Sequence, residues 1–470
     1  DVTDGQFMPA TSSDFAIVTL SSVNGKLKPA SGSSITVSGN WTTAIGGSSS
    51  FDGNSGTVTF DGSGQSLTNI GISFYNLSTS GTTILTNGDA LTVANDLTIA
   101  LNTRLIAGNN QPINVGGNWS NSGTFSASTG TVFFNGSGAQ TISGTNTFYD
   151  LTINNTHGSL KVSANGSTLT VQDDLLVSDG IFESASDYDD VTISAGATFE
   201  LTGDITVSGD WSNSGTFTPN SNTVTFDGGG AQSLTSGGSS FYDLTTATAS
   251  TDITIQDALV VTNHLTIAAS TTLDAGSDKA ISVGGNWSNS GTFTSASGTV
   301  TFNGSGAQTV TTGGVGTGND FNNVTITNTA ASPGTDYVQT SGAIKVDGTL
   351  DVTDGQFIPA ANSDFVNVTL SSSNGKLKQA GLGIITVSGT WNNSGGSAAS
   401  FEGNFGTIAF DAGGAQSLTS GGISFYNLST STSSTVVTIQ DALIVSNNLT
   451  IACSCFPKYI FIFIFFSLPK

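Results

Sequence analysis

Residues 117–125 read GNWSNSGTF, and related stretches surround each of the five tryptophans of the chain. In every copy a phenylalanine follows the tryptophan, and a second phenylalanine comes nine residues after the first. The second one ends a strand-like segment and precedes Asp or Asn and a glycine-rich turn. These repeat markers are Trp41, Trp119, Trp211, Trp287, Trp391, Phe60, Phe134, Phe226, Phe302 and Phe410. Such a repeat predicts a fold built from copies of one structural unit.

The composition indicates that these units are made of β-strands. Hydrophobic residues account for 36% of the chain, including 28 Phe, whereas only 9% of the residues are charged. Residues that favour helices, such as Glu, Lys, Arg, Met and Gln, are scarce. Short segments of alternating polarity, such as 97–99 and 151–153, are separated by turns rich in Gly, Asn and Ser. We therefore expect an all-β protein.

The spacing of the tryptophans favours one all-β architecture over another. Successive tryptophans lie 78, 92, 76 and 104 residues apart, and the two long intervals contain an additional Asp-Gly-x-Phe, at 179–182 and 354–357. A solenoid accepts one more coil simply by becoming longer, because each coil contacts only its neighbours. The spacing thus predicts a parallel β-solenoid (β-helix) of irregular coils. Tandem Ig-like β-sandwich modules are the alternative, since the constant nine-residue Phe-to-Phe step is also compatible with a hairpin.

The repeats divide the chain into five units and a tail. The expected units are residues 1–82, 83–157, 158–250, 251–330 and 331–452, of which the third and the fifth hold an extra coil. The first unit begins inside a repeat, because residues 1–7 recur at 351–357. Residues 453–470 break the pattern and contain both cysteines, so we interpret them as a foreign tail that arose from an out-of-frame or contig-end translation.

One family resemblance rests on the run 117–125 together with 130–136, 139–142 and 148–153. These stretches resemble the repeats of large bacterial surface proteins of the adhesin-like or haemagglutinin-like kind. The resemblance covers nearly all of residues 1–452. It implies a parallel β-helix on the outside of a cell, and it implies no particular activity.

The charge of the chain excludes one class of partner. The formal net charge is −23, and the cations are nine lysines and Arg104. Nucleic-acid binding requires clusters of Lys and Arg, so we expect no nucleic-acid partner. The apolar stretch in the tail is too short to span a bilayer, which needs about 20 residues, so we expect no membrane insertion.

Candidate catalytic residues are scarce. His157 and His264 have the sequence context of exposed turns, and the Asx residue after each second phenylalanine fits ordinary turn chemistry. The densest group of acids is Glu183, Asp187, Asp189 and Asp190. It is a weak candidate for Ca²⁺, which takes about six to eight oxygen ligands. No other metal or cofactor is expected, and a solvated acidic loop is the simpler interpretation.

These observations predict a structural role and no enzymatic activity. We expect the repeat region of a large extracellular or cell-surface protein, acting as a stiff stalk, filament or adhesin shaft. Its partners would be neighbouring repeats, copies of itself or surface glycans. Two alternatives remain open: a carbohydrate-binding adhesin module, which requires exposed aromatic side chains, and a β-helical polysaccharide-degrading enzyme, which requires clustered acids in a groove.

Overall fold

The protein is built of short parallel β-strands. A computed structural model describes residues 1–43, 49–82, 84–247, 249–316, 318–329 and 336–452, and no α-helix occurs in these ranges. The strand pairs recorded for them are parallel, as in Leu91–Val93 with Ile113–Val115. Ig-like sandwiches are antiparallel. The chain is therefore a β-solenoid, as the spacing predicted, and the sandwich alternative is wrong.

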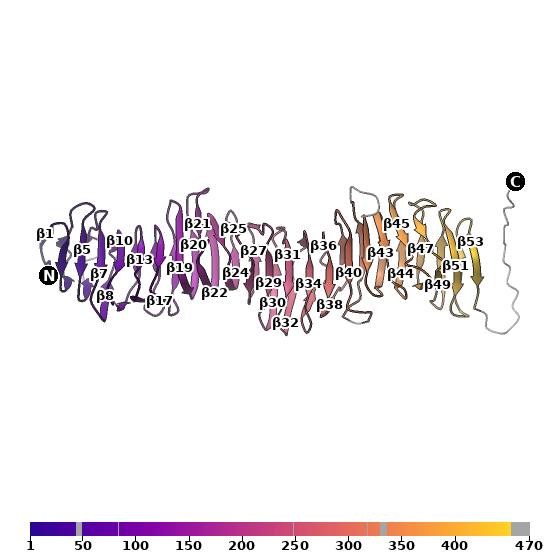
Figure 1. Cartoon of the computed structure of the whole chain (residues 1–470), viewed down its shortest axis with the longest axis horizontal. Helices are drawn as coiled ribbons and strands as arrows, with labels where there is room; N and C mark the ends of the chain where they lie inside the picture. Colours follow the sequence, from indigo (N-terminus) through magenta and orange to yellow (C-terminus); the bar gives the residue numbers. More distant parts are fainter. Residues whose placement is uncertain (44–48, 83, 248, 317, 330–335, 453–470) are drawn as a thin grey trace. The chain divides into compact units, whose positions relative to one another are not determined.

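One coil contains three strands. Strands β12 (Leu91–Val93), β13 (Leu97–Ile99) and β14 (Arg104–Ile106) make up one coil, and β15 (Ile113–Val115), β16 (Trp119–Asn121) and β17 (Thr124–Ser126) make up the next. Each strand pairs with its counterpart, β12 with β15, β13 with β16 and β14 with β17. Three parallel ladders thus run from coil to coil (Figure 1).

The strands are short because two or three inward side chains fill the width of the coil. In β12, β13, β15 and β16 the first and third residues are buried and the middle residue is partly exposed. This alternation follows from the two-residue period of a strand. Since each inward residue lies against the equivalent residue of the next coil, the core is a stack of Val, Ile, Leu, Phe and Trp.

The Phe-to-Phe step is a corner between two ladders. Phe125 lies on β17, which pairs with β14, whereas Phe134 ends β18 (Thr131–Phe134), which pairs with β15. The two strands belong to different ladders, and the turn between them carries the chain into the next coil. The hairpin interpretation of this step is therefore wrong.

The chain forms two compact units. The first comprises Asp1–Gly304 with short additions before residue 320, and the second consists mainly of residues 320–452. In the second unit, β43 (Lys345–Ile358), β44 (Asp364–Thr369), β46 (Ile384–Val387), β49 (Thr407–Phe410) and β51 (Ser424–Thr430) follow one another in the same parallel manner.

The first additional Asp-Gly-x-Phe segment, residues 179–182, spans the junction between β22 (Thr168–Asp179) and β23 (Ile181–Ser184), and the second, residues 354–357, lies within β43. In the first unit, β23 lies between β21 (Lys161–Ser163) and β25 (Thr198–Leu201). Gly180 and Gly355 both have positive φ, 78° and 73°, a conformation that glycine adopts at no steric cost. The division into five sequence units stays a prediction, and the tail 453–470 lies outside the described residues.

Candidate functional site

The tryptophans and phenylalanines of the repeat form interior clusters. Trp119 is fully buried, with its ring 4.8 Å from that of Phe125 and 5.2 Å from that of Phe148, both edge-on. Phe134 is buried too. All five tryptophans are at most 1% exposed, and Phe60, Phe134, Phe226, Phe302 and Phe410 are 0% exposed. These side chains hold the core together and are not available to a ligand.

A buried glutamine follows each of these clusters and binds the backbone of the preceding coil. Gln140 donates from Nε2 to the carbonyl oxygens of Val115 (2.9 Å) and Gly117 (2.7 Å). Its Oε1 accepts from Gly136 N–H (3.1 Å) and from Asn155 Nδ2 (2.9 Å). A side chain that is 1% exposed thus satisfies four buried polar groups. We call this arrangement the glutamine clamp.

The clamp recurs at the equivalent positions of the repeat. Gln65, Gln232, Gln308 and Gln416 each donate from Nε2 to a valine carbonyl of an earlier coil, and the first three also donate to the carbonyl of the glycine two residues after that valine. The acceptor half of the clamp recurs at Gln65 and Gln308, whereas Oε1 of Gln232 and of Gln416 has no protein partner. The Asx residue after each second phenylalanine hydrogen-bonds to the same valine through its backbone N–H, at 3.0–3.2 Å: Asp61, Asn135, Asp227, Asn303 and Asp411. This Asx position belongs to the corner between coils.

On the outside of the coils, polar side chains form a second recurring arrangement, the polar ladder. Asp96 N–H donates to Asn76 Oδ1 (3.1 Å), Asn118 N–H donates to Asp96 Oδ1 (2.8 Å), and Thr141 N–H donates to Asn118 Oδ1 (2.9 Å). Each side chain therefore accepts the backbone N–H of the residue one coil further on. Asx side chains suit this role because their oxygen is close to the main chain.

The same ladder explains one of the two histidines. His264 N–H donates to Asp243 Oδ1 (2.7 Å), Asn286 N–H donates to His264 Nδ1 (2.9 Å), and Thr309 N–H donates to Asn286 Oδ1 (2.8 Å). His264 thus replaces an Asx residue as an acceptor. The other histidine, His157, donates its backbone N–H to Asn155 Oδ1.

One stretch of the ladder is occupied by aspartates alone. Asp174 pairs with Asp190 in the strand register, Asp174 N–H donates to Asp150 Oδ1 (3.3 Å), and Asp210 N–H donates to Asp190 Oδ1 (2.5 Å). Asp150, Asp173 and Asp174 each have a carboxylate oxygen within 4.8 Å of the others, the only such group among the residues that the structure describes. We call these five aspartates, Asp150, Asp173, Asp174, Asp190 and Asp210, the acidic segment.

The carboxylates of the acidic segment lie close together, and the pKa values of several groups in and beside it are raised. Burial, followed by the charge of Asp173, raises the pKa of Asp174 above its ordinary value. Burial also raises the pKa of Asp190, with Asp189 as a nearby like charge. Hydrogen bonding to Asp173 raises the pKa of the Tyr149 phenol. Oxygen ligands of this kind are those that hard divalent cations accept.

The four acids singled out from the sequence are divided between two places. Glu183 lies on β23 and makes an ion pair with Lys161, which raises the pKa of that lysine. Asp187 accepts from Thr206 Oγ1 and Asp189 from Ser208 Oγ, whereas Asp190 belongs to the acidic segment. Glu183 thus lies on a different strand from the other three acids, which are on β24 (Asp187–Ile193). The candidacy of the four as a Ca²⁺ site stays a prediction. The three acids whose carboxylates do meet, Asp150, Asp173 and Asp174, were not among the residues expected from the sequence.

Within the described ranges, Arg104 and the lysines all have hydrogen-bond or ion-pair partners. Arg104 donates to Ser126 Oγ from Nε (3.0 Å) and from an Nη atom (2.8 Å). Each lysine in these ranges makes at least one ion pair with an acid: Lys26, Lys28, Lys161, Lys279, Lys345, Lys376 and Lys378. The acidic segment consequently has no lysine partner.

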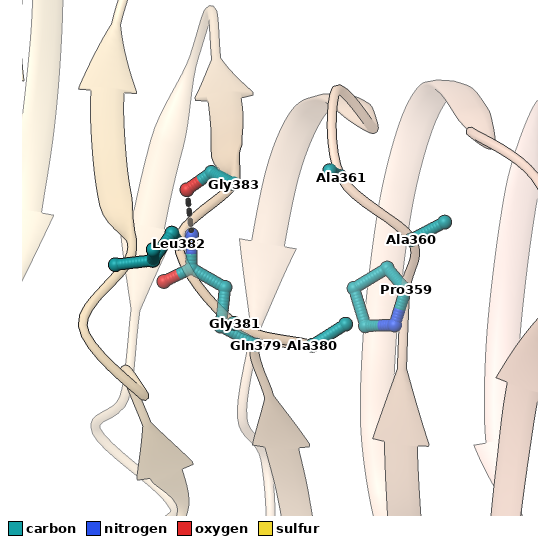
Figure 2. A pocket seen from close by; sticks show the side chains of 8 residues that line it. All are labelled: Pro359, Ala360, Ala361, Gln379, Ala380, Gly381, Leu382 and Gly383. Atoms are coloured by element: carbon teal, nitrogen blue, oxygen red, sulfur yellow. Dashed lines mark hydrogen bonds between the residues drawn. The ribbon is translucent and has the colours of Figure 1, made fainter.

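A small pocket lies in the second unit. It has a volume of about 150 Å³ and is lined by Pro359, Ala360, Ala361 and the stretch Gln379–Gly383. Figure 2 shows the Gln379 amide, which donates from Nε2 to the carbonyl oxygen of Gly383 (2.9 Å). Gln379 is 2% exposed and its Oε1 has no protein partner. None of the lining residues is charged.

The described part of the chain contains no helix long and apolar enough to cross a membrane. Comparison with known proteins gives no relative: no family model, no curated protein and no solved structure matches this sequence.

Proposed function

We propose that this chain is the structural repeat region of a large secreted or cell-surface protein and acts as a stiff shaft. The observation that carries the proposal is the way in which each coil is bonded to the next. Backbone pairing is supplemented by the glutamine clamp inside and the polar ladder outside. Because the backbone pairing recurs from coil to coil and the clamp recurs once in each repeat, stability accumulates with length.

The proposal includes a location outside the cell, and its acidic surface supports that part. A net charge of −23 with paired lysines disfavours association with other acidic polymers and keeps a repetitive chain soluble. The resemblance of the repeats to those of bacterial surface proteins points in the same direction.

The location is tested on the source cells. An antibody raised against the purified chain should label intact cells, and external protease should release peptides from residues 1–452. An antibody specific for a cytoplasmic protein serves as the control for lysis. Labelling that appears only after the cells have been permeabilised would refute the extracellular location.

The absence of enzymatic activity in this proposal is tested separately. The purified chain is incubated with a panel of neutral and acidic polysaccharides, with and without Ca²⁺, and new reducing ends and unsaturated products are measured. We expect none above the level of a heat-inactivated sample. Turnover that is lost in an Asp150→Asn, Asp174→Asn double variant would favour the β-helical enzyme instead.

A further inference from the structure

Two parts of the chain are close copies, and three of their differences place large apolar residues near one another in the second copy. Residues 1–60 and 351–410 align without gaps. In the second copy Leu382, Ile384 and Phe405 stand where the first has Gly32, Ser34 and Ser55. Each of these three changes replaces a small or polar residue by a large apolar one.

All three large residues are exposed. Leu382 is 84%, Ile384 46% and Phe405 62% exposed. Ile384 pairs with Thr407, so Leu382 and Phe405, each two residues earlier, occupy equivalent positions of adjacent coils. The ring of Phe405 lies 5.0 Å from that of Tyr426, edge-on. We call Leu382, Ile384, Phe405 and Tyr426 the aromatic patch.

The backbone at Phe405 is unfavourable for so large a residue. Its φ is 68°, and that of the preceding Asn404 is 42°. Bulky residues rarely adopt this left-handed conformation. Apart from its contact with Tyr426, the exposed ring gains little in the free protein, and residues with strained backbones gather at functional sites.

The patch adjoins the pocket of Figure 2, because Leu382 belongs to both. The pocket volume of about 150 Å³ is that of a cavity that holds one small ring. Asn427 borders the patch, since its Nδ2 donates to the carbonyl oxygen of Phe405 (3.5 Å). The site therefore combines an exposed aromatic ring, a ring-sized hollow and amide groups, and none of these side chains is charged at neutral pH.

We propose that the aromatic patch and this pocket bind a sugar residue of a neutral glycan. A pyranose ring has an apolar face of C–H groups, which stacks on Phe405, and hydroxyl groups, which need partners such as Gln379 Oε1, the amide oxygen in the pocket lining that has no protein partner. Because none of the side chains that line the site is charged, the site favours an uncharged ligand. Four side chains are too few for a protein partner, since a stable protein interface buries about 800 Å² on each side.

This inference deepens the proposed function by giving the shaft a ligand, but it has its own test. The whole chain is applied to a microarray of neutral, acidic and N-acetylated oligosaccharides, and hits are measured by NMR titration. The variant Phe405→Ser introduces the residue that occupies the same left-handed turn in the first copy, where φ of Ser55 is 61°. It should therefore fold at least as well as the native chain.

We expect binding of neutral glycans that Phe405→Ser weakens roughly tenfold, which is the size of an aromatic contact. Leu382→Ser should weaken it as well. Val315→Ser, which alters another exposed apolar residue (52%) outside the patch, should leave it unchanged. The proposal is overturned if no neutral glycan binds at millimolar concentration, or if Phe405→Ser binds as the native chain does. It is also overturned if the substitution abolishes self-association of the chain instead. None of these outcomes bears on whether the chain lies at the cell surface.

Discussion

Replacing Gln140 by methionine tests the glutamine clamp as the element that holds one coil on the next. Methionine has nearly the same volume, so the substitution removes hydrogen bonds without leaving a large cavity. Four bonds of Gln140 are lost, to Val115 O, Gly117 O, Gly136 N–H and Asn155 Nδ2. Each is worth about 1 kcal/mol net, and their partners remain buried, so we expect a local loss of about 4 kcal/mol.

The loss has to be measured locally, because a repeat array does not unfold as a single two-state unit. Hydrogen exchange followed by mass spectrometry reports the protection of the peptide that contains Gly136. A loss of about 4 kcal/mol lowers protection roughly 1,000-fold, since each 1.4 kcal/mol is a factor of ten. The equivalent peptide around Gly304, whose N–H donates to Gln308 Oε1 (2.9 Å), is an internal reference in the same molecule.

The control variant is Gln256→Met, which makes the same chemical change at an exposed position. It should leave protection within about twofold of the native value throughout the chain. The reasoning is refuted if the Gly136 peptide of Gln140→Met exchanges as slowly as in the native chain. The coils would then be held by backbone pairing and apolar packing alone.

Three further predictions concern the core, the ladder and the acidic segment. Trp119→Ala should cost about 3–5 kcal/mol, since the ring is buried and its Nε1 donates to Asn146 Oδ1 (2.7 Å), and should lower the denaturation midpoint. Gly117→Ala should be destabilising by about 1–3 kcal/mol, because a Cβ would lie 2.6 Å from the backbone carbonyl carbon of Asn95. Gly138→Ala, with open space around it, should be neutral in the same assay. The pKa of Asp174 is raised in the folded protein. Its stabilising contribution is therefore complete below the ordinary value near 3.8 and is lost as the pH rises through the folded pKa. Local hydrogen-exchange protection of residues 168–179 should increase on acidification from pH 7, and Asp174→Asn should increase this protection at pH 7 and reduce its pH dependence.

Much of the fold was predictable from local features. The alternation of polar and apolar residues, the repeated Trp and Phe positions and the low charge predicted an all-β repeat protein, and the unequal tryptophan spacing favoured a solenoid over tandem sandwiches. The solenoid places all five tryptophans in its core, although not on one ladder. Trp41 pairs with Leu67 on the ladder that continues to Phe125, whereas Trp119 pairs with Leu97 and Ile142 on another. The tolerance of a solenoid for extra residues accounts for the unequal spacing.

The polar arrangements depended on the three-dimensional structure. The repeated glutamine was visible in the sequence, but its four partners lie 4 to 25 residues away, on both sides along the chain. The acidic group was expected among neighbours in sequence, yet Asp174 meets Asp150 from 24 residues earlier and Asp190 from 16 residues later.

The sequence by itself determined which residues face inward, because that depends on a two-residue period. Only the tertiary structure decided which outward residues meet, since that depends on the length of each coil. Coil length varies along the chain, from 22 residues between Leu91 and Ile113 to 19 between Ile113 and Val132. Neighbours across coils, including the aromatic patch and the acidic segment, are therefore set by turn lengths that no local pattern encodes.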